Sequence, residues 1–290
     1  MADFYSLSFD LFSPLVKKYS KYFERLETDL RRARINVRKD YWGSFIILVM
    51  VLTFISILIV GLPFALLLGN FQFMPMVIFS AVLIGITISS GVLTYFYPAI
   101  IAGERQKKID NTLPFSTIYM STIARSGFPP QDIFKMISRF KEYGEISTEA
   151  QQISRDVETL GLDLPSALTR AINRSPSQYW GELLAGIRTT ITLGGDLGQF
   201  LAEKTNGFVA DYKRRLNEFS NLLSLLIEIY ITIVVVGAVF FVVVTSIMLA
   251  VGGVPVATVK ALNYALVLIG LPILTAAFIL LMKGASPLEN

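Results

Sequence analysis

The stretch that decides the fold is the polar segment from Glu104 to Asn221, which begins ERQKKIDNTLPF and ends DYKRRLNEFSN. It carries 15 of the 26 Lys and Arg residues of the chain and lies between two pairs of long apolar runs. A segment this polar does not enter the hydrocarbon core of a bilayer, whereas the apolar runs are long enough to cross one. The sequence therefore predicts a water-facing domain held by membrane helices on both sides.

Three glycines recur in this segment at nearly constant spacing, since Gly127, Gly161 and Gly194 are 34 and 33 positions apart. A glycine just past a helix end, followed by Pro or Asp at the start of the next helix, is typical of a helical hairpin. The following helices are expected to open at Pro129-Pro130, at Asp163-Leu164-Pro165 and at Asp196, and the third hairpin is expected to start at Ser175-Pro176-Ser177. Three such hairpins predict a domain of six helices.

Two further helix starts are predicted from capping residues. Asn111 or Thr112 can cap a new helix that has Pro114 in its first turn and carries Phe115, Ile118, Tyr119 and Ile123 inward. Ser147 can cap the first helix of the second hairpin, with the carboxylate of Glu149 favoured by the positive end of the helix dipole. We therefore expect the preceding helix to end just before each of these two positions.

The apolar runs and the basic residues predict a membrane topology. Nine Lys and Arg residues precede the first run and 15 lie in the polar segment, against none and one in the two turns on the other side. Basic residues are retained on the cytoplasmic side, so both termini and the polar domain are expected in the cytosol, with the chain in the cytoplasmic membrane. The predicted segments are an amphipathic, basic N-terminal segment (1–43), a transmembrane hairpin (44–102), a cytosolic six-helix domain (103–221), a second transmembrane hairpin (222–282) and a short tail (283–290).

Composition excludes most catalytic chemistry. The chain has no Cys and no His, which removes thiol nucleophiles, imidazole bases and the commonest zinc ligands. Gly194-Gly195-Asp196-Leu197-Gly198 lacks the Lys-Ser/Thr of a nucleotide loop. The net charge of +4 is modest, and the distribution of Lys and Arg along the chain indicates its orientation in the membrane. No nucleic-acid partner is therefore predicted. We expect a protein that is not an enzyme and holds no catalytic residue, metal or cofactor.

The N-terminal segment has an apolar face, with Leu15, Leu26, Leu30 and Ala33 recurring at helical spacing over residues 4–33. Two interpretations fit this pattern. The helix packs on the chain's own cytosolic domain, or it lies on lipid headgroups.

The whole arrangement resembles a known family, the F-domain platform proteins of type II secretion, type IV pilus and archaellum machinery. The resemblance extends from about residue 30 to residue 282 and rests on the order of spans and helices. The motif residues are Leu113-Pro114, Arg125-Ser126-Gly127, Gly161 with Leu164 and Ala167-Leu168, and Gly194-Gly195-Asp196-Leu197. With one helical domain between two pairs of spans, the chain is similar to the single-domain Tad-type and archaeal members. The 34-residue period also matches tetratricopeptide repeats, but their Trp-Leu-Gly-Tyr pattern is missing.

The resemblance implies a non-enzymatic platform that couples a hexameric secretion ATPase to the extraction of pilin-like subunits from the membrane and to filament assembly. Membrane lipids and a second copy, or a second F-domain protein, are the other implied partners. A transporter or channel subunit with a cytosolic regulatory domain is the alternative, although the spans hold no charge at the bilayer midplane. A membrane enzyme is a third possibility. The chain can be a whole protein or one module of a two-module protein.

Two groups of residues are candidates for contacts. Arg125, Lys135 and Arg188 lie near predicted turns and are the expected contacts of the ATPase. Glu228 is the only charged residue in the run 222–250. It is either hydrated at the cytoplasmic interface or makes a polar contact with another span or with the membrane segment of a pilin.

Overall fold

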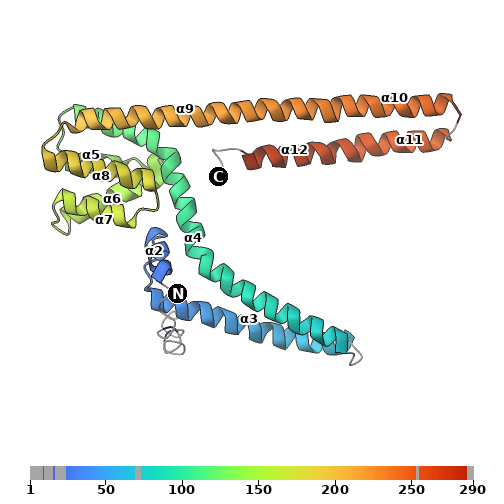
Figure 1. The fold of residues 1–290 in the computed structure, drawn as a ribbon, viewed down its shortest axis with the longest axis horizontal. Helices are drawn as coiled ribbons and strands as arrows, with labels where there is room; N and C mark the ends of the chain where they lie inside the picture. Colours follow the sequence, from blue (N-terminus) through green and yellow to red (C-terminus); the bar gives the residue numbers. More distant parts are fainter. Residues whose placement is uncertain (1–8, 10–15, 17–23, 69–72, 253–254, 286–290) are drawn as a thin grey trace. The chain divides into compact units, whose positions relative to one another are not determined.

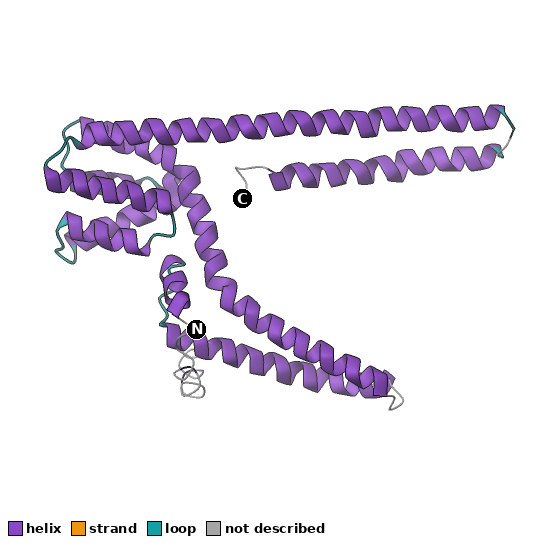
Figure 2. Ribbon diagram, in the orientation of Figure 1, coloured by secondary structure: helices purple, strands orange, loops and turns teal. Residues whose placement is uncertain are grey.

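The computed structural model describes residues 9 and 16 and the ranges 24–68, 73–252 and 255–285. In these residues all regular structure is helical and no strand occurs (Figure 2). The chain divides into two compact units, residues 1–202 and residues 203–290. Helix α9 (Leu197–Tyr230) begins in the first unit and continues in the second (Figure 1). The predicted all-α fold class is confirmed.

Four helices of the described chain are long and apolar enough to span a membrane. They are Lys39–Ile59, Ala81–Arg125, Leu197–Ala250 and Val256–Gly284. Two precede the centre of the polar segment and two follow it, as predicted. The chain is therefore a multi-pass membrane protein with its polar helices between two pairs of spans.

In the first pair, α3 (Lys39–Leu68) packs along the N-terminal part of α4 (Phe73–Arg125). The hydroxyls of Thr53 and Ser90 are 3.0 Å apart across the two helices. At the next residue of α4, a Cβ added to Gly91 would lie 2.6 Å from the sulfur of Met50. The absence of a side chain at Gly91 therefore lets the Met50 side chain of α3 pack directly on the backbone of α4, and small residues are common where membrane helices pack.

Helix α4 continues from the span through the polar segment without a break, so the predicted new helix at Asn111 or Thr112 is wrong. Proline inside a helix costs about 3 kcal/mol, since it removes one hydrogen bond and its ring clashes with the preceding turn. Around Pro114, however, one face of α4 is fully buried at Ile109, Leu113 and Met120. Each such side chain contributes roughly 2 kcal/mol by leaving water, and together they outweigh the proline.

Four more helices complete the helical part of the first unit. They are α5 (Pro130–Arg139), α6 (Gly144–Glu158), α7 (Leu164–Arg174) and α8 (Gln178–Leu193), with a short 3-10 turn η2 (Lys141–Tyr143) before α6. Their buried faces share one core, whose largest fully buried side chains include Phe134, Ile137, Ile146, Ile153, Leu168 and Trp180. The neighbours along the chain, α5 with α6 and α7 with α8, pack as pairs.

The helix starts test the predicted caps. Asp163 and Ser177 cap α7 and α8, accepting hydrogen bonds from the backbone N–H groups of Ser166 and Trp180, and Asp196 caps α9 through the N–H of Gln199. The predicted cap at Ser147 is wrong. Helix α6 already begins at Gly144, and the Ser147 hydroxyl instead donates to the carbonyl of Ser138 at 3.0 Å.

Between residues 103 and 221 the chain thus forms the second half of α4, then α5 to α8, and the first part of α9. That these segments make a cytosolic bundle of six helices stays a prediction, because α9 leaves the first unit after residue 202.

The N-terminal helix α2 (Glu24–Arg32) packs on its own chain. Leu26 and Leu30 are buried in a cluster with Trp42 and Ile46 of α3. This supports the first of the two interpretations of the amphipathic segment, except that the first span supplies much of the surface. Residues 4–23 of the predicted helix lie outside the described residues, apart from 9 and 16.

The second unit is a helical hairpin. Helix α9 continues through a π-helical turn η3 (Ile231–Val236) into α10 (Gly237–Ala250), and the return arm is α11 (Val256–Ala265), a second π-helical turn η4 (Leu266–Gly270) and α12 (Leu271–Ala285). Two polar contacts join the arms, Tyr230 with Thr275 at 3.4 Å and Thr245 with Asn263 at 3.2 Å. The last helix of the polar segment is thus continuous with the third candidate span, Leu197–Ala250.

Candidate functional site

The three repeat glycines stand where helices end. Gly127, Gly161 and Gly194 all have positive φ angles, of 77°, 66° and 71°. At the end of α8 the N–H of Gly194 bonds the carbonyl of Ile191, and the N–H of Gly195 bonds that of Thr190. This pair of bonds is a Schellman motif, which needs a left-handed residue that glycine adopts without steric cost.

These three turns lie at one end of the first unit. A Cβ added to Gly198, at the start of α9, would lie 3.1 Å from the side chain of Arg125 at the end of α4. The start of α5 and the end of α6 meet through an ion pair of 2.7 Å between Lys135 and Glu158. Leu164, at the start of α7, lines the same small cleft of about 180 Å³ as these two residues.

Each turn also exposes a large apolar side chain beside its glycine. Phe128 is 45% exposed, Leu160 55% and Leu193 78%. Single exposed apolar residues are common, but one at every turn of the same end makes a repeated feature. The residues Gly127, Phe128, Leu160, Gly161, Leu193 and Gly194 are called the turn surface below.

The predicted contacts of the ATPase are only partly brought together. Arg125 is exposed at the turn surface, and Lys135 lies beside it in its ion pair with Glu158. Arg188 does not join them, because its guanidinium donates a hydrogen bond of 2.9 Å to the hydroxyl of Thr169 on α7. Its role as a contact of the ATPase stays a prediction, with an internal contact as a competing use.

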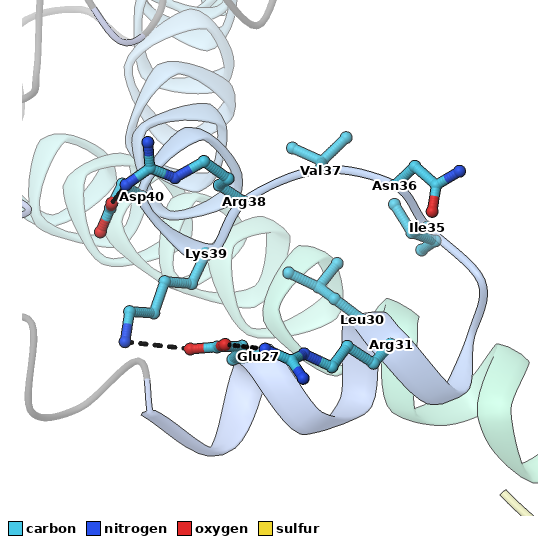
Figure 3. Close-up of a pocket in the computed structure, with 9 residues that line it drawn as sticks. All are labelled: Glu27, Leu30, Arg31, Ile35, Asn36, Val37, Arg38, Lys39 and Asp40. Atoms are coloured by element: carbon cyan, nitrogen blue, oxygen red, sulfur yellow. Dashed lines mark hydrogen bonds and ion pairs between the residues drawn. The ribbon is translucent and has the colours of Figure 1, made fainter. Parts of the chain in front are cut away.

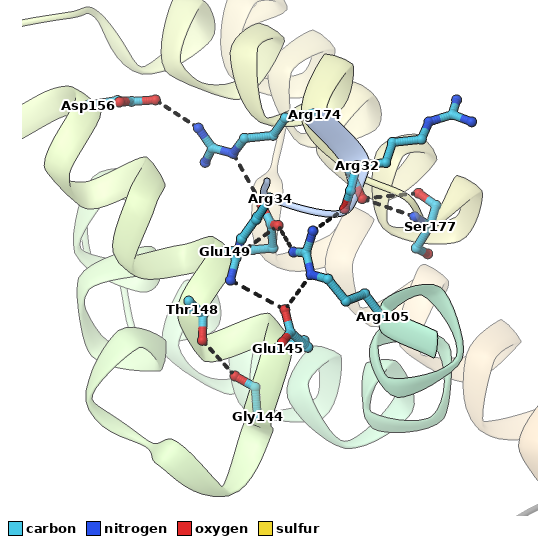
Figure 4. A network of polar contacts seen from close by, with 11 residues as sticks. Arg32, Arg34, Arg105, Gly144, Glu145, Thr148, Glu149, Asp156, Arg174 and Ser177 are labelled. Atoms are coloured by element: carbon cyan, nitrogen blue, oxygen red, sulfur yellow. Dashed lines mark hydrogen bonds and ion pairs between the residues drawn. The ribbon is translucent and has the colours of Figure 1, made fainter. Parts of the chain in front are cut away.

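At the other end of the helical part, a network of charged residues is centred on Glu149 of α6 (Figure 4). The side chain of Glu149 is fully buried and accepts hydrogen bonds from three arginines. The distances are 2.9 Å from Arg34, 2.8 Å from Arg105 and 3.2 Å from Arg174. These arginines come from the segment after α2, from α4 and from α7, so one carboxylate joins four parts of the chain.

Two further carboxylates balance the charge of the network. Glu145 contacts Arg34 at 3.3 Å and Arg105 at 3.0 Å, and Asp156 contacts Arg174 at 3.1 Å. Arg105 also donates to the backbone carbonyl of Arg32. The three arginines that bind Glu149 thus face three carboxylates, and the more exposed Arg170 also lies 3.8 Å from Asp156. The residues Arg34, Arg105, Glu145, Glu149, Asp156 and Arg174 are called the Glu149 network below.

Arg34 enters the network from a strained backbone position. Its φ is 57°, the left-handed region that glycine normally fills. The N–H groups of Arg34 and Ile35 bond the carbonyls of Arg31 and Leu30, which is a Schellman end of α2 with arginine at the left-handed position. Burial lowers the pKa of the Arg34 guanidinium, while the carboxylates of Glu149 and Glu145 act in the opposite direction. Burial is the larger effect on this pKa, so the ion pairs offset only part of the cost of burying the charge.

The sequence reasoning missed this network, because Glu149 was assigned to the first turn of a helix. A signal for it does exist. Glu149 and Asp156 fall on the same helical stripe as Ile146, Ala150 and Ile153, all of which are buried. A carboxylate on an apolar stripe needs a cationic partner, since an unpaired buried charge costs several kcal/mol, on the order of 3 to 5.

Among the described residues, no group of acidic side chains is placed to hold a metal ion. Glu228 lies on α9 in the second unit with an exposed side chain, and its backbone carbonyl accepts a hydrogen bond from Thr232. Its proposed contact with another span stays a prediction.

Comparison with known proteins finds a family match for part of the chain. Residues 117–245 match the family model described as type II secretion system (T2SS), protein F. Two curated relatives come from Methanocaldococcus jannaschii. The uncharacterized protein MJ1286 is 26% identical over 53% of this chain and 24% of its own length. The uncharacterized protein MJ0780 is 33% identical over 45% of this chain and 36% of its own length.

The chain thus spans only about a quarter and about a third of these relatives. No solved structure matches it. The family match begins within α4 and ends within α10, so it contains the whole turn surface together with Glu145, Glu149, Asp156 and Arg174. Residues 117–245 of this chain form a type II secretion system protein F domain.

Proposed function

We propose that this chain is a non-enzymatic platform protein of a type IV pilus-like or type II secretion-like system. In this role it couples a cytosolic secretion ATPase to the extraction of pilin-like subunits and to filament assembly. The proposal includes a cytosolic domain over 103–221, both termini in the cytosol, and a second copy or a second F-domain protein as partner in the cytoplasmic membrane. The F domain match supports it.

The observation that carries the proposal is the continuity of α4. This helix contains a candidate span and then continues to Arg125 at the turn surface. From Arg105, in the Glu149 network, to Arg125 the helix rises about 30 Å at roughly 1.5 Å per residue. A force applied at the turn surface therefore acts on the span through one continuous helix.

The turn surface is the proposed contact of the ATPase. Its apolar side chains lie beside the exposed Arg125 and the Lys135–Glu158 pair. Contacts with exposed charges at the rim of an interface act mainly on the association rate and weaken with salt.

The test is retention of the purified secretion ATPase of the same system by the detergent-solubilised chain. The variant Arg125→Glu/Lys135→Glu is expected to weaken binding about tenfold at low salt, with a smaller difference at high salt. Arg139→Glu/Lys141→Glu is the matched control, because it makes the same charge change at exposed residues at the other end of α5 and in η2. Equal binding by the wild type and the first variant, with both folded by circular dichroism, would remove the turn surface from the proposal.

A further inference from the structure

A cleft of about 470 Å³ lies between α2 and the start of α3 (Figure 3). It is formed by residues on both sides of the short connection from residue 33 to residue 38. Its lining combines three basic side chains, Arg31, Arg38 and Lys39, with three apolar ones. The apolar side chains are Leu30, Ile35 and Val37. The cleft belongs neither to the turn surface nor to the Glu149 network.

The charges of this cleft do not cancel. Arg31 and Lys39 both contact one carboxylate, that of Glu27, at 2.6 Å and 3.0 Å. Arg38 is 78% exposed and reaches Asp40 only at 3.4 Å. Three cations thus face two carboxylates, and the side chains in Figure 3 surround an opening with one positive charge in excess.

Glu27 remains the ionised partner of two cations. Hydrogen bonds from Lys39 first, and then from Arg31, lower the pKa of the Glu27 carboxyl. Both cations therefore lie at the cleft in contact with Glu27. They remain accessible to a ligand, since the Arg31 side chain is 67% exposed and that of Lys39 33%.

The position of the cleft along the chain fixes its depth relative to a bilayer. The candidate span begins at Lys39, which is itself a lining residue, and no charged residue follows Asp40 in α3. The end of a membrane span that carries basic residues lies at the level of the lipid headgroups. The cleft therefore opens where phosphate groups are concentrated, with apolar lining residues that suit the glycerol and upper acyl part of a lipid.

We propose that this cleft binds the headgroup of an anionic phospholipid, with Arg31, Arg38 and Lys39 facing the phosphate. Guanidinium and ammonium groups bind phosphate through charge-assisted hydrogen bonds. The same chemistry would accept free phosphate, but a lipid is already held beside the cleft by the membrane. A lipid bound here would brace the connection between α2 and α3, next to the residue Arg34 that enters the Glu149 network.

The test is native mass spectrometry of the full chain in detergent, incubated with equal amounts of dioleoylphosphatidylglycerol and dioleoylphosphatidylcholine. The wild type is expected to retain phosphatidylglycerol at least about fivefold better, from about 1 kcal/mol per cation near a membrane surface. Arg31→Gln/Arg38→Gln should lose most of this preference. Arg139→Gln/Lys141→Gln removes two exposed cations elsewhere in the same unit and should keep it.

The substitution Glu27→Gln distinguishes lipid binding from a purely structural role, in which the charged cluster only holds α2 on α3. Removing this carboxylate leaves Arg31 and Lys39 without their shared partner, so retention of phosphatidylglycerol should rise about fivefold. If the cluster only holds α2 on α3, the substitution lowers the melting temperature and leaves lipid retention unchanged, which overturns the proposal.

Three other results overturn it as well. They are equal retention of the two lipids by the wild type, an equal loss in the Arg139/Lys141 control, and displacement of phosphatidylglycerol by millimolar inorganic phosphate. The last result would mark a site for a soluble anion. Circular dichroism of each variant shows that a lost preference is not a lost fold.

Discussion

Two of the carboxylates on helix α6 lie in opposite surroundings. Glu149, near its start, is fully buried and accepts hydrogen bonds from three arginines, whereas Glu158, its last residue, is half exposed and pairs with Lys135 alone. The first holds the helical part to the α4 segment that follows the span and to the segment before α3. The second lies at the turn surface. The same residue type on the same helix therefore serves assembly at one end and a surface at the other.

The difference follows from desolvation. A buried carboxylate that loses its partners leaves charges without water, and a broken buried pair costs on the order of 3 to 5 kcal/mol. An exposed pair keeps most of its hydration, so its loss costs less than about 1 kcal/mol. The buried ion pairs of the Glu149 network therefore hold the helices firmly together. The exposed Lys135–Glu158 pair beside the turn surface can break at little cost when a partner protein binds there.

The largest expected effect is that of Glu149→Ala. It leaves Arg34, Arg105 and Arg174 without their common acceptor and should lower the melting temperature of the solubilised chain by about 10 °C. Glu158→Ala is the matched control on the same helix and should change it by less than about 3 °C. Scanning fluorimetry in one detergent measures both. Similar shifts in the two variants would show that burial does not separate the two ends.

Smaller effects on stability, of opposite sign, are expected for alanine substitutions at a glycine inside α8 and at the glycine just after it. Gly194→Ala places a side chain at φ 71° and should destabilise the chain by about 1 kcal/mol. Gly181→Ala lies inside the helix with no atom within 4 Å of the added Cβ, so it should stabilise by up to about 1 kcal/mol. Thermal unfolding compares them directly. A stabilising Gly194→Ala would mean that the turn surface does not need its left-handed backbone.

The smallest effect concerns pH at the exposed pair of Glu27 with Lys39 and Arg31. The pKa of Glu27 is lowered in the folded chain, so the pair stabilises the fold above the unfolded value of about 4.5, and this contribution is lost as pH falls through the lowered folded value. The wild type should exceed Glu27→Gln by less than about 1 kcal/mol at pH 7. The difference should shrink as the pH falls below about 4.5 and vanish once the pH lies below the lowered folded pKa. A difference that grows toward low pH would contradict the sign of this linkage.

Much of the fold follows from neighbours along the chain. The spans are visible as uncharged runs, and the caps at Asp163, Ser177 and Asp196 act on N–H groups three residues ahead. The positive φ angles of Gly127, Gly161 and Gly194 were implied by their place between helical patterns. These features are local, and side-chain chemistry at short spacing is enough to specify them.

The local rules failed where burial decided. Pro114 and the possible cap before it predicted a new helix, but the buried face of Ile109, Leu113 and Met120 keeps α4 continuous. Phe115 and Ile118, which looked like inward residues of that helix, are 47% and 46% exposed. The buried face of α4 includes Ile109. A helix assumed to begin at residue 112 leaves Ile109 out, so the apolar pattern of the segment was assigned to the wrong face.

The sequence by itself determined the four spans, the glycine turns and most of the helix starts, because each depends on residues a few positions apart. Only the tertiary structure decided what the charged residues do. The partners of Glu149 lie 115, 44 and 25 positions away, and Arg188 is joined to Thr169 on another helix. Coulombic and hydrogen-bond energies depend on distance in space and on burial, and neither quantity exists until the helices have packed.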